Sequence, residues 1–187
     1  MPSQTNGLDD FMVFLRQYAN LIAAGFGSAA VLLITQLTSV APPWPSAAIQ
    51  LTAIAQLFVL MFVAQLMSGW KRRRVSRAMK VGALFAVVFA LSYFGILSMV
   101  EYEDPGGDRQ LRGLICTQAA AATYSDCPFL ARGLVDSGYQ PSEIWTSFGL
   151  ALSRTLVLVL WTCFICCTSF VLAAFAYFQR SEKIEEA

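Results

Sequence analysis

Two long apolar runs on either side of a basic turn decide the fold of this chain; residues 47–100 read AAIQLTAIAQLFVLMFVAQLMSGWKRRRVSRAMKVGALFAVVFALSYFGILSMV. Residues 47–69 and 81–100 contain no Asp, Glu, Lys or Arg. About 20 apolar residues are enough for an α-helix to cross the hydrocarbon core of a bilayer. Because a charge at the centre of such a helix costs about 2.5 kcal/mol or more, the two runs predict two transmembrane helices.

Two further apolar runs extend this pattern in both directions. Residues 20–40 carry no charge, and residues 41–46, Ala-Pro-Pro-Trp-Pro-Ser, turn the chain back because proline cannot continue a helix. The last span is predicted over residues 150–178, in a helix expected to begin near Pro141, a favoured first-turn residue. Arg154 would then lie near the membrane interface.

The composition agrees with a membrane protein. The chain is 57% hydrophobic and only 13% charged, whereas soluble domains contain about 25% charged residues. We therefore expect an all-α fold with a single transmembrane domain, residues 1–187. It would be an integral membrane four-helix transmembrane bundle, up-down-up-down, with a small outward-facing cap between spans three and four.

The distribution of charge predicts which side of the membrane each loop faces. The basic loop, residues 70–80, holds six of the 13 basic residues and no acidic one. Residues 101–143 contain seven acidic residues against three arginines. By the positive-inside rule the basic loop is cytoplasmic and segment 101–143 faces outward. Both the N and C termini of this multi-pass protein are then cytoplasmic.

The six basic residues of the loop are also candidates to hold lipid headgroups. Each basic residue near the surface of an anionic membrane contributes about 1 kcal/mol of attraction. Their role as a topology signal alone also explains them. They are Lys71, Arg72, Arg73, Arg74, Arg77 and Lys80.

The outward segment contains two cysteines, Cys116 and Cys127. On an oxidising side of a membrane, cysteines so placed are expected to form a disulfide; the alternative is two thiols packed against the helix ends. A segment this small cannot build an independent core without such a link. We expect it to fold as short helices over the bundle or to be held by a partner.

Small residues line the first span. Ala23 and Gly27, and likewise Gly25 and Ala29, have the four-residue spacing that lets helix backbones approach closely. The partner of this surface is either another helix of the same bundle or a helix of another subunit, and the sequence leaves both open.

Four glutamines lie in or near the spans: Gln36, Gln50, Gln56 and Gln65. The steps between Gln50, Gln56 and Gln65 do not keep them on one helical face. Hydrogen bonds from helix to helix are therefore favoured over a continuous hydrated path.

The residue types that perform catalysis or bind metals are scarce. The chain has no histidine, the commonest general acid–base group and metal ligand. Cys163, Cys166 and Cys167 fall inside the last span, where cysteine usually behaves as a small hydrophobic residue rather than as part of a redox or metal site. No nucleotide-binding loop or nucleophile motif is found. We expect no catalytic residue, no cofactor, no metal, no nucleic acid and no small-molecule substrate.

The layout of a short first outer loop and a longer cysteine-containing second one is superficially similar to that of tetraspanins. The Cys-Cys-Gly triplet of that family is absent, and the first loop, residues 41–46, has no cysteine and so lacks the motif of a Trp with paired Cys that claudins carry. No family is therefore assigned and no function is carried over.

Three functions are compatible with these features. The favoured one is a non-catalytic subunit of a larger membrane complex, which contacts membrane lipids and other integral membrane subunits and acts in assembly, docking or stabilisation. The alternative is a small oligomeric channel or transporter whose polar path is shared between protomers. An enzyme is the least expected, since its carboxylates would have to come from Glu101, Glu103 and Asp104, which more simply end the third span.

Overall fold

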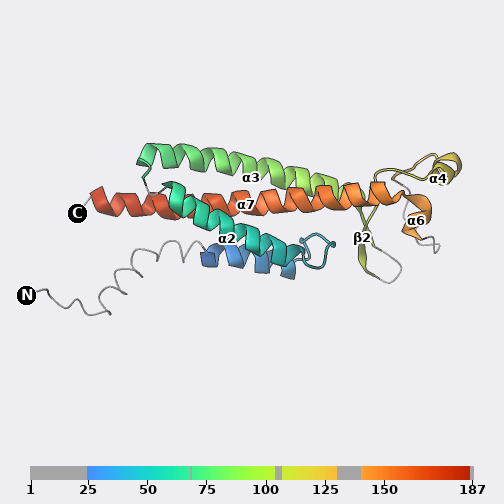
Figure 1. Cartoon of the computed structure of the whole chain (residues 1–187), viewed down its shortest axis with the longest axis horizontal. Helices are drawn as coiled ribbons and strands as arrows, with labels where there is room; N and C mark the ends of the chain where they lie inside the picture. Colours follow the sequence, from blue (N-terminus) through green and yellow to red (C-terminus); the bar gives the residue numbers. More distant parts are fainter. Residues whose placement is uncertain (1–24, 68, 104–106, 130–139, 186–187) are drawn as a thin grey trace, which may run out of the picture. The chain divides into compact units, whose positions relative to one another are not determined.

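The computed structural model describes residues 25–67, 69–103, 107–129 and 140–185, and it is mostly helical (Figure 1). Three helices are long and apolar enough to cross a membrane: α2 (Ala48–Met67), α3 (Arg72–Val100) and α7 (Ser147–Glu185). They confirm helices at three of the four predicted spans and indicate a multi-pass membrane protein. A shorter apolar helix covers Gly25–Leu37; residues 20–24 of the predicted first span lie outside the described part.

Two helix boundaries differ from the sequence prediction. α3 begins at Arg72, so most of the basic loop is the first turns of a helix rather than irregular chain. Pro141 begins only the single turn α6 (Pro141–Ile144), and α7 starts afresh at Ser147. The break falls at Trp145, whose backbone is extended and whose side chain is buried.

The segment after α3 also contains β structure, which the all-α prediction missed. Strands β1 (Glu101–Glu103) and β2 (Arg109–Leu111) pair antiparallel, with Tyr102 opposite Gln110. A hairpin of three-residue strands has too short an alternation to be recognised from sequence. Its turn includes residues 104–106, which the structure does not describe.

The chain divides into two compact units. The first contains the Gly25–Leu37 helix with most of α2, the first half of α3 and the second half of α7. Its core is apolar, and its innermost members include Val63, Met67 and Ala174. The second unit contains residues 39–51 and 87–164. A cluster around Trp145 and Tyr102 forms the core of its part between α3 and α7.

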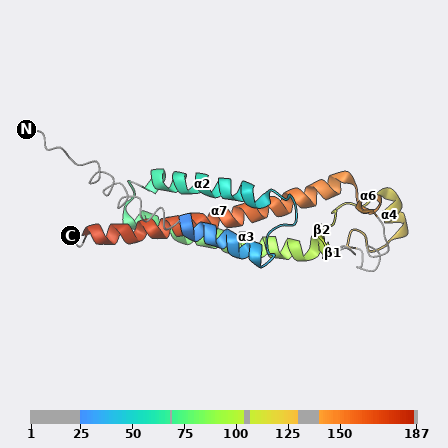
Figure 2. The same cartoon turned by 90° about the horizontal axis from the view of Figure 1, so that it is seen from below.

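α3 packs against α7 within each of the two units (Figures 1 and 2). In the first unit the Arg72 guanidinium lies 4.5 Å from the centre of the Phe178 ring. In the second unit the ring centres of Tyr93 and Trp161 are 5.3 Å apart. Within the first unit a Cβ at Gly82 would meet Phe170, so residue numbers rise along α3 as they fall along α7, as antiparallel packing requires.

Candidate functional site

The segment between α3 and α7 is cross-linked by the predicted disulfide between Cys116 and Cys127, whose Cα atoms are 6.3 Å apart. Thr117 follows the first cysteine and caps the short helix α4 (Gln118–Thr123), because its hydroxyl oxygen accepts from the backbone N–H of Ala120. The same hydroxyl donates to the carbonyl of Glu143 at 2.9 Å. The disulfide loop is thus tied to the turn that precedes α7.

Trp145 occupies the centre of this cap. Its side chain is fully buried, its indole N–H donates to the carbonyl of Pro128 at 3.2 Å, and its ring centre lies 6.0 Å from that of Tyr102. Its backbone pairs with Cys116 as an isolated β-bridge. One side chain therefore joins the hairpin, the disulfide loop and the start of α7.

Two glycines let the chain pass close to this tryptophan and to α7. A Cβ at Gly113 would lie 2.5 Å from the Cβ of Trp145, and a Cβ at Gly149 would lie 2.7 Å from the backbone nitrogen of Ile115. The Ile115 carbonyl in turn accepts from the N–H of Thr146 at 2.9 Å. The cap thus contacts α7 through backbone as well as side chains.

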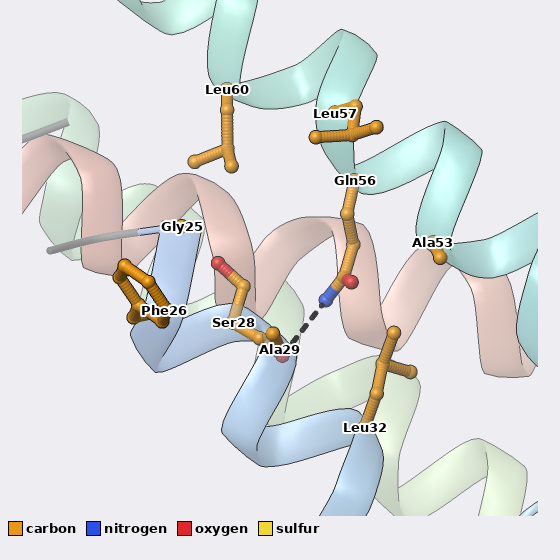
Figure 3. Close-up of a pocket in the computed structure, with 9 residues that line it drawn as sticks. All are labelled: Gly25, Phe26, Ser28, Ala29, Leu32, Ala53, Gln56, Leu57 and Leu60. Carbon is orange, nitrogen blue, oxygen red and sulfur yellow. Dashed lines mark hydrogen bonds between the residues drawn. The ribbon is translucent and has the colours of Figure 1, made fainter. Parts of the chain in front are cut away.

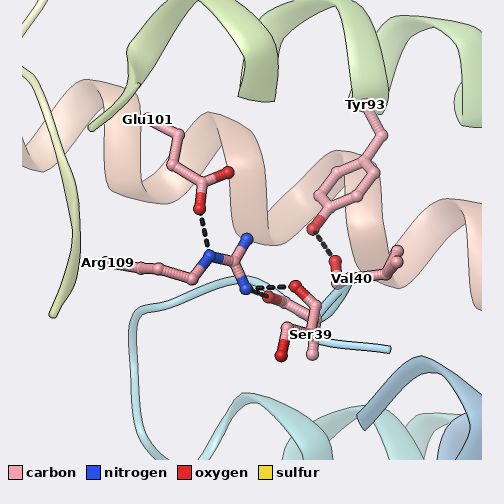
Figure 4. A network of polar contacts seen from close by, with 6 residues as sticks. Ser39, Val40, Tyr93, Glu101 and Arg109 are labelled. Carbon is pink, nitrogen blue, oxygen red and sulfur yellow. Dashed lines mark hydrogen bonds and ion pairs between the residues drawn. The ribbon is translucent and has the colours of Figure 1, made fainter. Parts of the chain in front are cut away.

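Arg109 links the hairpin to residues 39–41, which follow the Gly25–Leu37 helix (Figure 4). Its guanidinium forms an ion pair with Glu101 and donates to the carbonyls of Ser39 and Ala41. The hydrogen bond that Arg109 donates to the Glu101 carboxylate raises the pKa of Arg109 above its ordinary value. Nearby, the Tyr93 hydroxyl donates to the carbonyl of Val40 at 2.7 Å. Glu101 is therefore engaged in holding two loops together rather than presented as a lone carboxylate.

A hollow lies in the first unit, between the Gly25–Leu37 helix and α2 (Figure 3). Its volume is about 380 Å³. Gly25 and Ala29 are the small residues of its lining at the first helix. Phe26 and Leu57, whose side chains are exposed, also line it. The other lining residues are Ser28, Leu32, Ala53, Gln56 and Leu60.

Gln56 and Ser28 are the polar residues that line this hollow, and the Gln56 amide is already hydrogen-bonded. Its Nε2 donates to the hydroxyl of Ser169 at 2.9 Å and contacts the carbonyl of Ser28 at 3.4 Å. All three residues are almost fully buried. Hydrogen bonding from helix to helix is thus confirmed for Gln56, and the hollow is left apolar.

The small residues of the first helix face different neighbours. A Cβ at Gly25 would be 3.8 Å from Leu60 of α2, and a Cβ at Gly27 would be 3.8 Å from Leu172 of α7. Ala29 is exposed and lines the hollow. Ala23 lies outside the described residues. Gly25 and Gly27 therefore have neighbours within the chain, and contact of this face with another subunit stays a prediction.

The basic residues predicted to hold lipid headgroups lie at the start of α3. Arg72 is half-buried against Phe178, whereas the other five are exposed. Arg74 lies over Trp70, with its guanidinium carbon 5.2 Å from the ring centre.

The cysteines of α7 form no metal site among the residues that the structure describes. Cys163, Cys166 and Cys167 are half-buried and not disulfide-bonded, and no group of three potential metal ligands occurs there. This arrangement agrees with a packing role.

Sequence reasoning missed Arg109, Tyr93 and Trp145, which organise the contacts around the hairpin and the disulfide loop. A lone arginine among acids and an aromatic residue in a span are common surface and packing features. The one sequence feature that could have pointed to any of these residues was the position of Trp145 just before an apolar run. Comparison with protein-family models, curated proteins and solved structures finds no match to this chain.

Proposed function

We propose that this chain is a four-span integral membrane protein, up-down-up-down with both termini cytoplasmic, which serves as a non-catalytic subunit of a larger membrane complex. The span through residues 20–40 would be completed by the chain ahead of Gly25. The outward cap and the spans would act as docking surfaces for other integral membrane subunits.

The hollow between the Gly25–Leu37 helix and α2 is the observation that carries this proposal. In a bilayer the lipid tails are as apolar as leucine, so helices associate mainly through close packing at small residues. A hollow of about 380 Å³ with Gly25 and Ala29 in its lining is a surface on which another helix gains such packing. Phe26, at 74% exposure, and Leu57, at 61%, stand beside it.

The outer side supports the same role. The disulfide, the buried Trp145 and the Arg109 contacts hold the cap and the loop of residues 39–45 in a defined conformation. Pre-organised surfaces lose less entropy when they bind a partner.

A matched pair of alanines tests the proposal. Ala29 and Ala30 are adjacent and exposed, but only Ala29 lines the hollow. Ala29→Trp should abolish the co-purification of partner chains in mild detergent, whereas Ala30→Trp should leave it intact. A photo-crosslinking residue at Leu57 should capture the same partner. If the chain instead purified alone and passed ions in liposomes, the channel alternative would replace the subunit proposal.

A further inference from the structure

Besides the hollow, the first unit contains a groove where the basic start of α3 meets the second half of α7. Its volume is about 480 Å³, within the range of about 300–1,000 Å³ that is usual for ligand pockets. Arg74 and Arg77 line one end of it. Val81, Phe85 and Phe170 are among the apolar residues that line the rest.

The groove follows one face of α3. Arg74, Arg77, Val81 and Phe85 are separated by three or four residues, the spacing of neighbours on a helical face. At 1.5 Å per residue the distance from Arg74 to Phe85 is about 16 Å. This is close to the thickness of one leaflet, half of a hydrocarbon core of about 30 Å. The groove is thus cationic at one end and apolar for the remaining depth.

The charge at its polar end lacks a counter-ion among the described residues. Neither Arg74 nor Arg77 has a carboxylate within ion-pair distance there; Arg74 contacts the Trp70 ring instead. The first turn of α3 contains three arginines and no acidic residue. Cations are unfavourable at the positive end of a helix dipole, and a bound anion would relieve this repulsion.

We propose that this groove binds one anionic phospholipid, with its phosphate between Arg74 and Arg77 and one acyl chain along Val81, Phe85 and Phe170. Guanidinium groups bind phosphate oxygens in fork geometry, and Trp70 is a residue type enriched at headgroup level. A free phosphate would satisfy the arginines but leave the apolar part of the groove empty. The proposal requires that α3 and α7 span a membrane, but it does not require a partner subunit.

Native mass spectrometry of the full chain in detergent tests the headgroup end. The probes are phosphatidylglycerol and phosphatidylcholine with the same acyl chains. Phosphatidylglycerol should be retained at least about tenfold more strongly. Arg74→Gln with Arg77→Gln should reduce its retention about 30-fold, since each basic residue contributes about 1 kcal/mol and 1.4 kcal/mol is tenfold.

Lys71→Gln with Arg73→Gln is the matched control, because it removes the same charge from exposed positions that do not line the groove. This pair should reduce retention less than about threefold. Equal losses from the two pairs would mean a diffuse attraction to charge and would overturn the proposal. Equal retention of the two lipids would overturn it as well.

A second pair of variants tests the acyl end. Val81 and Val88 lie on α3 with nearly equal exposure, 48% and 47%, but only Val81 lines the groove. Val81→Trp should fill the groove and lower phosphatidylglycerol retention, whereas Val88→Trp should not. Inorganic phosphate should fail to displace the lipid. If phosphate displaced the lipid and Val81→Trp left phosphatidylglycerol retention unchanged, the groove would be a simple anion site. That result would contradict the proposal of a bound phospholipid.

Discussion

Gln56 is a polar side chain in an apolar helix, and its amide finds its partners on two other helices. Its bond to Ser169 and its contact with Ser28 join α2 to α7 and to the Gly25–Leu37 helix. The amide thus helps to set the rotation and depth of α2 against its neighbours, a role that apolar side chains perform with less directional preference.

Removal of this amide should destabilise the bundle modestly. Hydrogen bonds between helices in membranes contribute about 0.6 kcal/mol on average and about 1.7 kcal/mol at most. Gln56→Leu and Ser169→Ala should therefore show a coupling energy of this size in a double-mutant cycle of unfolding in mixed micelles. Gln50→Leu, at an exposed position of α2, is the control. A coupling energy of zero would show that the bond adds nothing to stability.

Arg109 holds the hairpin against residues 39–41. Arg109→Gln should lower the free energy of unfolding by about 1–3 kcal/mol, because three acceptors lose a charged donor. Arg109→Lys should restore part of the lost free energy of unfolding. A lysine ammonium keeps the positive charge, but it lacks the planar fork of donors with which the guanidinium reaches all three acceptors.

The pH dependence of this contribution follows from the raised pKa of Arg109. Because the pKa of Arg109 is higher in the folded state, its contribution to stability is fully present at pH values below its ordinary pKa and is lost only as the pH rises beyond that value. The difference in the free energy of unfolding between wild type and Arg109→Leu should therefore not decrease through titration of Arg109 between about pH 6 and 9. Chemical unfolding of the two proteins measures this difference. A steep fall of this difference in that range would contradict the assignment.

At the scale of elements, the cap depends on close backbone approach. Gly113→Ala and Gly149→Ala should each cost about 1–3 kcal/mol, because the added methyl group overlaps Trp145 or the backbone of Ile115. Gly95→Ala on α3 is the control, since nothing lies within 4 Å of its Cβ position. Thermal unfolding followed by tryptophan fluorescence reports the difference, and equal stability of the three variants would be inconsistent with tight packing.

The disulfide is the second element-scale constraint on the cap. Its cysteines are 11 residues apart, and closure of a loop of that length stabilises by about 3 kcal/mol in the chain-entropy model. Cys116→Ser with Cys127→Ser should lower the stability of the cap by about this amount, read as faster proteolysis between α3 and α7. Cys163→Ser, in α7 and outside the disulfide, should leave the proteolysis rate unchanged.

At the scale of the whole molecule, the proposed topology makes one clear prediction. A reporter fused after Ala187 should remain cytoplasmic, whereas one inserted at Gly107, in the exposed hairpin turn, should be exported. The physical reason is the excess of Lys and Arg in residues 70–80 over residues 101–143. Export of both reporters would contradict an even number of spans.

Charge and apolar length are read directly from a sequence, and these properties sufficed for the helices at residues 48–67, 72–100 and 147–179. The Cys116–Cys127 pair was likewise predictable, because few partners were available in a short segment. Each of these features depends on local composition. For the helices, lipid penalises any charged residue that interrupts an apolar run.

What the sequence determined by itself is therefore an apolar pattern typical of a multi-pass membrane protein and the approximate position of its three long helices, but not where α3 and α7 begin. Tertiary structure alone decided that Gln56 meets Ser169, that Arg109 reaches Ser39 and Ala41, and that Trp145 interrupts the helix begun at Pro141. These contacts join residues far apart in the chain, and their geometry depends on which helices become neighbours. The same holds for the two grooves, whose linings combine residues of separate helices.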